Sequence, residues 1–160
     1  MPPLLSIVIP TYKRADILVQ CLRHIELQTM AKQIEVIVVS DGHDDATAEL
    51  IRHIEKTEHS SNASLAGFQF IEIEKSQQGV ARNRGTEKAN ADRALFIGDD
   101  ILLAPDACEK HLAAGGSRLA AALGFTTWDP ACGITDVMRW LEVSGWQFGY
   151  PMIAQYAHKD

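Results

Sequence analysis

Four polar clusters each follow a short apolar run of the sequence, and they hold the residue types best suited to chemistry. The clusters are Thr11-Tyr12-Lys13-Arg14, Asp41-Gly42-His43-Asp44-Asp45, Gln78-Gly79-Val80-Ala81-Arg82 and Asp99-Asp100. If the apolar runs are strands of one parallel sheet, the clusters meet at its carboxyl edge, where open α/β sheets bind ligands. Carboxylates, guanidinium groups and an aromatic ring gathered there predict a site for a divalent ion and an anionic ligand.

The adjacent carboxylates of Asp99 and Asp100 directly follow the fourth apolar run. Mg²⁺ or Mn²⁺ is typically held by one or two carboxylates and completes its shell with phosphate oxygens. The pair is therefore a candidate metal site. On spacing alone, a turn that caps a helix near Pro105 explains the same two residues.

The other clusters also have structural explanations. Asp41 followed by glycine is typical of an Asx turn, and Arg82 on a short helix is more often a solvated residue than a ligand clamp. Tyr12 suits packing as well as binding. His43 lies among acidic residues, but the loose spacing on one loop favours solvated polarity over a metal site.

Several classes of protein are disfavoured by motif and composition. The loop after the first apolar run contains no glycine, which argues against a dinucleotide fingerprint and a P-loop. The formal net charge of -6 repels a polyanion, so no nucleic-acid partner is expected. Three cysteines without C-x-x-C spacing disfavour a disulfide framework and a zinc site.

Apolar runs of strand length alternate with segments of helical period, which predicts an α/β fold with a Rossmann-like, mostly parallel sheet flanked by helices. We expect strands at residues 5–10, 34–40, 68–73 and 93–97, and a fifth strand at 119–125. Helices are expected after the first two strands, at 78–90, from Pro105 to Ala113, and at 136–144, with Asp44 or Asp45 capping the second. The N-terminus lacks a basic region and a long apolar stretch, so neither a signal peptide nor a transmembrane segment is expected, and a cytoplasmic location follows.

The ordered motifs resemble the family 2 glycosyltransferases of the GT-A fold, which are inverting enzymes that use nucleotide-activated sugars. The resemblance is carried by SIVIPTYKR, CLRHIELQT, VIVVSDGHDDAT, GVARNRGTEKA and ALFIGDDILLAP, and it covers about residues 4–115. Two departures stand out. Ser40 replaces the usual first acid of a pair, and the acidic element reads G-D-D-I.

The resemblance implies a role for each polar cluster. The residues implied to bind the nucleotide sugar are Pro10, Thr11, Tyr12, Arg14, Asp41, Gly79, Arg82 and Asp99. Among them, Asp41 would hydrogen-bond the base. Asp100, together with Asp99, would hold Mn²⁺ or Mg²⁺.

The resemblance also implies an acidic general base on the acceptor side, and no such motif occurs before Asp160. Asp129, Asp136 and Glu142 are better explained as turn, cap or surface residues, so no catalytic residue is assigned. We expect a truncated chain, with a nucleotide-sugar-binding domain at 1–125 and an incomplete acceptor-side region at 126–160. Truncation would expose Trp140, Trp146 and Phe148 and favour self-association.

The function implied is inverting transfer of a sugar from a nucleoside-diphosphate sugar, with a UDP-sugar favoured, to a hydroxyl of a saccharide, lipid or other acceptor. Peripheral membrane association is compatible with such acceptors. One alternative is a non-catalytic module that binds nucleotide sugars. A less favoured alternative is a sugar nucleotidyltransferase, whose chemistry favours a glycine-rich basic loop that PTYKR lacks.

Overall fold

The computed structural model describes residues 2–58, 65–115, 121–146 and 149–150 of the 160-residue chain. The chain divides into two compact units, Met1–Ala122 and Leu123–Asp160. All four polar clusters belong to the first unit. No helix in the described part of the chain is long and apolar enough to cross a membrane.

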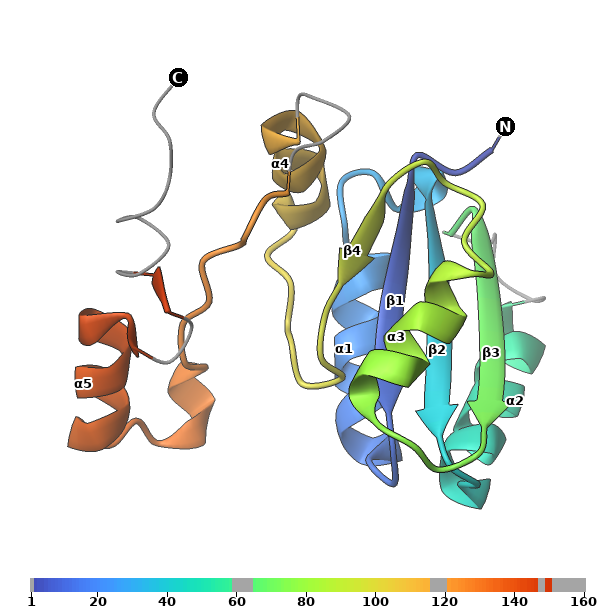
Figure 1. Ribbon diagram of the computed structural model, residues 1–160, viewed down its shortest axis with the longest axis horizontal. Coiled ribbons are helices and arrows are strands. Elements are labelled where there is room, and N and C mark those ends of the chain that lie inside the picture. Colours follow the sequence, from blue (N-terminus) through green and yellow to red (C-terminus); the bar gives the residue numbers. More distant parts are fainter. Residues whose placement is uncertain (1, 59–64, 116–120, 147–148, 151–160) are drawn as a thin grey trace. The chain divides into compact units, whose positions relative to one another are not determined.

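The first unit is built on a parallel sheet with the strand order β3-β2-β1-β4 (Figure 1). The strands are β1 (Leu5–Thr11), β2 (Ile34–Asp41), β3 (Gly67–Ile73) and β4 (Ala94–Phe96). Thr11 is paired with Ser40, and Ser40 is paired with Glu72, so three strands end level with one another. The predicted α/β fold with a mostly parallel sheet is confirmed.

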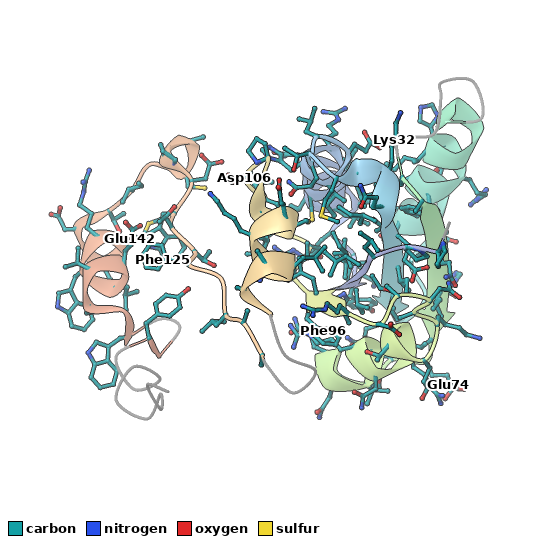
Figure 2. All side chains as sticks on the ribbon, turned by 90° about the horizontal axis from the view of Figure 1, so that it is seen from above. Lys32, Glu74, Phe96, Asp106, Phe125 and Glu142 are labelled. Carbon is teal, nitrogen blue, oxygen red and sulfur yellow. The ribbon has the colours of Figure 1, made fainter. Side chains whose placement is uncertain are left out.

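Helices cover both faces of this sheet, as the end-on view in Figure 2 shows. α1 (Ala15–Glu26) and α2 (Asp45–Glu58) lie on one face, and α3 (Gln78–Thr86) lies on the other. Every residue of β1 and β2 is buried, which explains their continuous apolar runs. On the α3 face, a Cβ at Gly85 would collide with Val8, so glycine allows the helix to lie close to the sheet.

The segment after β4 is fastened to the end of α1 by a buried glutamine. The amide nitrogen of Gln28 donates to the Ala104 carbonyl at 2.7 Å, and its oxygen accepts from the Cys108 backbone N–H at 3.1 Å. The neighbouring Thr29 N–H donates to the Pro105 carbonyl at 2.8 Å. These bonds connect the segment between α1 and η1 (Ala31–Gln33) to the start of α4 (Ala107–Ala114), and they fix the chain that leaves the acidic pair.

The expected strand at 119–125 is wrong over its described part, because residues 121–125 form no strand. Residues 119 and 120 lie outside the described residues. The run LAAALGF is apolar but consists mainly of alanine and glycine, which are depleted in strands. Hydrophobicity alone was therefore a poor signal at this position.

The second unit contains η2 (Pro130–Cys132) and α5 (Asp136–Ser144), and α5 has the bounds predicted from the sequence. Figure 2 labels Phe125 and Glu142 in this unit. The Phe125 ring stacks on the Tyr150 ring at 5.3 Å, and Glu142 accepts a hydrogen bond from the Trp128 backbone N–H at 3.2 Å. Trp140 and Trp146 are 62% and 64% exposed, whereas Phe148 lies outside the described residues. Self-association through this unit stays a prediction.

Glu35 is a buried carboxylate at the start of β2, at the edge opposite the polar clusters. It accepts hydrogen bonds from the Ser6 hydroxyl, from the Asn90 backbone N–H, and from the Asn90 side-chain amide at 2.8 Å. Burial opposes ionisation of Glu35, but these hydrogen bonds outweigh it and hold the pKa of the carboxyl below its usual value. The charged carboxylate thus joins β1, β2 and the segment between α3 and β4.

We predict that Glu35→Gln lowers the free energy of unfolding at pH 7 by about 1–3 kcal/mol, because the amide cannot accept the same set of hydrogen bonds. The pKa of Glu35 is lower in the folded than in the unfolded chain, so its contribution is present above about pH 4.3 and is lost as the pH falls further. Urea unfolding from pH 7 to pH 3 should show the two proteins converging at the acid end. The matched control is Glu49→Gln at an exposed position of α2, and an equal loss in both variants would contradict the prediction.

Candidate functional site

The carboxyl ends of the strands bring three of the four polar clusters to one edge of the sheet (Figure 1). Thr11 ends β1 and Tyr12 follows it, Asp41 ends β2, and the acidic pair follows β4. Parallel pairing alone dictates this convergence, since all the strands point the same way.

Thr11, Arg14, Asp99 and Asp100 form one connected group, here called the acid site. The Thr11 hydroxyl donates to Asp99 Oδ2 at 2.7 Å. The two terminal nitrogens of Arg14 contact Asp99 Oδ1 and Asp100 Oδ2, each at 3.0 Å. Asp99 is only 4% exposed, whereas Asp100 faces solvent. A buried and an exposed carboxylate are therefore held side by side by one guanidinium.

Burial and charge shape the protonation of the acid site. Burial raises the pKa of the Asp99 carboxyl above its usual value, although the Thr11 hydrogen bond and the Arg14 charge oppose the rise. The hydrogen bond to Asp100 raises the pKa of Arg14. Arg14 therefore stays charged and offsets the repulsion between the two neighbouring acids.

The donor set of the acid site fits a hard divalent cation. Two carboxylates are available, and no group of three or more His, Cys, Asp or Glu side chains suited to a metal occurs among the described residues. Mg²⁺ commonly uses one or two protein carboxylates and takes its other ligands from water and phosphate. A Cβ at Gly98 would lie 2.6 Å from Asp100 Oδ1, so glycine leaves room for this carboxylate.

Tyr12, Gly42 and Lys75 line an open cavity of about 520 Å³ beside the ends of β2 and β3, here called the Tyr12 pocket. The ammonium of Lys75 lies 4.1 Å from the centre of the Tyr12 ring. Gly42 has φ +121°, and a Cβ there would lie 2.9 Å from the Tyr12 ring. The aspartate–glycine step therefore serves both the turn and the close approach of the aromatic ring.

Asp41 lies next to the Tyr12 pocket and accepts three hydrogen bonds. Its Oδ2 accepts from Lys75 Nζ at 2.8 Å, and its Oδ1 accepts from the Ser76 backbone N–H at 2.7 Å and the Ser76 hydroxyl at 3.0 Å. The hydrogen bond with Lys75 lowers the pKa of Asp41 although burial opposes it. Asp41 is therefore a charged acceptor at neutral pH.

The residues around Asp41 have structural tasks. The Ser40 hydroxyl donates to the Gly42 carbonyl at 2.7 Å, so the serine that departs from the usual acidic pair stabilises the turn. Asp44 caps α2 by accepting from the Thr47 hydroxyl at 2.6 Å and from the Thr47 backbone N–H. It also accepts from the Lys13 backbone N–H at 2.7 Å and so holds Lys13 at φ +54°. Of the two predicted caps, Asp44 is the one used.

His43 pairs with residues on either side of the loop. Its ring nitrogens contact Glu72 at 2.8 Å and Asp45 at 3.2 Å, and the side chain is 74% exposed. The hydrogen bond to Glu72 raises the pKa of His43. This arrangement agrees with solvated loop polarity.

The remaining predicted site residues make no side-chain hydrogen bond or ion pair within the described residues. Pro10 is buried within β1 opposite Val39, and Gly79 is exposed on α3 with open space around it. Arg82 is half-buried on α3, and its Nε is buried without a hydrogen-bond partner among the described residues. No hydrogen bond or ion pair in the described part of the chain joins Arg82 to Asp41 or to the acid site. Its place in the site stays a prediction.

Sequence reasoning missed Lys75 and Ser76, which are the partners of Asp41. The available signal was their position directly after β3, at the same edge as the other clusters. Gln28 was also missed, although it lies in one of the quoted motifs.

Comparison with known proteins finds sequence relatives for most of the chain. The sequence model of glycosyl transferase family 2 matches residues 6–147 of the chain. The chain is 31% identical over 116 residues to the putative glycosyltransferase EpsH of Bacillus subtilis (strain 168). This match covers 72% of this chain and 31% of EpsH. The chain is also 34% identical over 113 residues to the validoxylamine A glucosyltransferase of Streptomyces hygroscopicus subsp. jinggangensis. This match covers 70% of this chain and 25% of that protein.

Two solved structures share the fold. One is S. aureus TarS 1-349 in complex with UDP, with a TM-score of 0.58 and 21% identity over 68% of this chain and 31% of the other. The second is the mannosyltransferase PcManGT from Pyrobaculum calidifontis in complex with GDP-Man and Mn²⁺, with a TM-score of 0.55 and 23% identity over 64% of this chain and 29% of the other.

The chain spans about a quarter to a third of the length of the curated relatives named above. The family match, in contrast, extends over most of the chain and includes β1, β2 and the acidic pair. The fold, the acid site and the sequence match lead to one assignment: the chain belongs to glycosyltransferase family 2.

Proposed function

We propose that this chain binds the nucleoside-diphosphate sugar used by a metal-assisted, inverting glycosyltransferase, and that the donor is a UDP-sugar. The proposal depends on one observation, which is that two consecutive residues serve two neighbouring sites. Thr11 donates a hydrogen bond to Asp99, and Tyr12 lines the neighbouring cavity. One short segment at the end of β1 thus belongs to the acid site and to the Tyr12 pocket. A ligand with an aromatic base and an anionic diphosphate has one part suited to each.

The Tyr12 pocket supplies the features needed for a nucleobase. Tyr12 lines the cavity, and stacking of a base on an aromatic side chain is worth about 1–3 kcal/mol per base where it has been measured. The charged Asp41 carboxylate beside it accepts hydrogen bonds only, so it favours a base that presents an N–H. The UDP complex of TarS supports a uridine nucleotide, because that neighbour shares the fold over 68% of this chain.

The acid site supplies the features needed for the diphosphate. Asp99 and Asp100 would hold Mn²⁺ or Mg²⁺, which when bound neutralises the charge on the departing nucleoside diphosphate. Arg14 keeps the two carboxylates together and brings a permanent positive charge to the same place. PcManGT, whose structure contains GDP-Man and Mn²⁺, supports this use of a divalent ion.

Residues on the flanks complete the proposed donor site. Pro10 precedes the Thr11-Tyr12 segment, and Gly79 and Arg82 lie on α3. The unpartnered Nε of Arg82 supports a contact with the donor, since buried polar atoms normally have a hydrogen-bond partner.

The transfer step proposed for the whole protein is a direct displacement with inversion. The acceptor hydroxyl oxygen forms a bond to the anomeric carbon while the bond from that carbon to the diphosphate oxygen breaks, and the hydroxyl proton passes to a base. We assign no such base to this chain. Asp129 caps η2 by accepting from the Ala131 N–H, Glu142 binds the Trp128 N–H, and Asp136 begins α5. The proposal therefore gives this chain donor binding, not acceptor deprotonation.

We predict that UDP binds with Mn²⁺ and that Asp100→Asn weakens this binding at least about tenfold, because one of two metal-ligand charges is lost. Titration calorimetry with UDP, with and without Mn²⁺, measures the effect. Asp106→Asn is the matched control, since Asp106 lies six residues further along and pairs with Lys110 instead. Binding that needs no metal and survives Asp100→Asn would remove Asp100 from its role.

We predict that Gly42→Ala weakens UDP binding and costs about 1–3 kcal/mol of stability, because the new Cβ requires a strained φ of +121° and meets the Tyr12 ring. Gly79→Ala is the control for stability. A Cβ at Gly79 meets no atom within 4 Å, and alanine in a helix is favoured over glycine by up to about 1 kcal/mol. Denaturant unfolding and UDP titration of both variants measure the two effects, and a stable Gly42→Ala variant with unchanged affinity would contradict this view of the pocket.

A further inference from the structure

We propose that the guanidinium of Arg14 and a divalent ion bind the acid site in turn, so that Arg14 leaves Asp99 and Asp100 when the ion binds. Arg14 then sets the affinity for the ion, because its own contacts must be broken first. The inference rests on the proposed function, since it needs a divalent ion at the two carboxylates. It adds to that site a competitor that belongs to the chain itself.

Arg14 contacts one oxygen of each carboxylate. Its Nη1 lies 3.0 Å from Asp99 Oδ1, and its Nη2 lies 3.0 Å from Asp100 Oδ2. The second oxygen of Asp99, Oδ2, accepts the hydrogen bond from the Thr11 hydroxyl at 2.7 Å. The Asp99 oxygen that is not bonded to Thr11 is therefore the one that Arg14 contacts, and an ion held by both aspartates meets the guanidinium there.

Charge prevents Arg14 and the ion from sharing these oxygens. A carboxylate oxygen has two lone pairs, so the number of acceptor sites alone does not exclude sharing. The two carboxylates carry two negative charges, which one divalent ion neutralises, and Arg14 adds an excess positive charge when no nucleotide is bound. Cations on the same oxygen repel each other, and the burial of Asp99 strengthens the repulsion because little water screens it.

The side chain of Arg14 can leave while its backbone stays in place. The Arg14 carbonyl accepts hydrogen bonds from the Ile17 and Leu18 N–H groups at 3.0 Å and 2.9 Å, which fixes the backbone at the start of α1. The side chain is 41% exposed, and in the described part of the chain it pairs with no acid other than the two aspartates. A rotation of this one side chain into solvent is therefore sufficient for the exchange.

A purely supporting role for Arg14 makes the opposite prediction. If Arg14 stays in place and holds the two carboxylates together for the ion, its removal lets them move apart and weakens ion binding. If Arg14 leaves, its removal strengthens ion binding, because the ion no longer has a competitor. The direction of the change therefore separates the two roles.

The first experiment is a titration of the full chain with Mn²⁺ without nucleotide, in which electron paramagnetic resonance measures the free ion. We expect Arg14→Gln to bind Mn²⁺ about three- to tenfold more tightly than wild type, a modest gain because ion pairs that reach solvent are weak. Thermal unfolding by circular dichroism gives an independent readout. Mn²⁺ should raise the unfolding temperature of Arg14→Gln by more than that of wild type, because the ion then neutralises the buried Asp99.

Lys13→Gln is the matched control. Lys13 is exposed and carries the same charge as Arg14, but its ammonium lies 5.2 Å from the centre of the Tyr12 ring and forms no ion pair with either aspartate among the described residues. Its removal should change the Mn²⁺ affinity by about twofold or less, since water and salt screen an exposed charge. An equal gain in both variants reflects only the loss of a positive charge and overturns the exchange.

The second experiment follows the Arg14 side chain in wild type, so it does not depend on the folding of a variant. Mg²⁺ is diamagnetic, and NMR spectra can therefore be recorded during a titration with it. We expect the Arg14 Nε–H signal to move toward the position of a solvated arginine, with the same Mg²⁺ dependence as the Asp100 backbone N–H. A response of Asp100 without any response of the Arg14 side chain overturns the exchange.

The outcomes separate this inference from the proposed function. Weaker or unchanged Mn²⁺ binding by folded Arg14→Gln overturns the exchange, while the role of the ion at the two aspartates stands. Binding that occurs only with UDP present, and equally in wild type and Arg14→Gln, also overturns it. If neither protein binds Mn²⁺, with or without UDP, the part of the ion in the proposed function is itself wrong.

Discussion

The arrangement of the site depends on the buried carboxylate of Asp99. A charge removed from water is costly unless it is paired and hydrogen-bonded, and Thr11 and Arg14 supply both kinds of contact. Thr11 ends β1, Arg14 precedes α1, and Asp99 follows β4. The hydrogen bond and the ion pair that the Asp99 carboxylate needs therefore hold these three segments together. Asp100 is then carried to the surface beside it, where Arg14 also reaches it.

At the opposite edge of the sheet, a second buried carboxylate holds neighbouring segments together. There the buried Glu35 carboxylate gathers Ser6 and Asn90 and so closes the amino-terminal side of the fold. No positive side chain pairs with Glu35 among the described residues, whereas Asp99 pairs with the guanidinium of Arg14. Glu35 thus stabilises the fold, and Asp99 places a charged group at the edge where open α/β sheets generally bind ligands. Gln28 adds a third tie, because it fixes the chain that leaves Asp100.

The sequence carried enough information for the fold and for the outline of the site. Continuous apolar runs predicted β1 and β2, because strands covered on both faces need them, and parallel pairing then predicted the meeting of Thr11, Asp41 and the acidic pair. The partners of Asp41 could not be predicted, since Lys75 and Ser76 come from a different strand and depend on its register. Residues 121–125 of the strand expected at 119–125 form no strand, because alanine and glycine have poor strand propensity despite the apolar character of the run. Which of Asp44 and Asp45 caps α2 also depended on a long-range contact, with Lys13.

The central claim is that a single divalent ion binds at Asp99 and Asp100 next to a nucleotide held at Tyr12. Paramagnetic broadening by Mn²⁺ in the amide NMR spectrum of the chain, recorded with UDP present, tests it most directly. We expect the signals of residues 11–14 and 98–101 to broaden first, while those of Ser6 and Ala91 at the far edge stay sharp. Broadening centred instead on His43 and Glu72, or spread evenly over the chain, would contradict it.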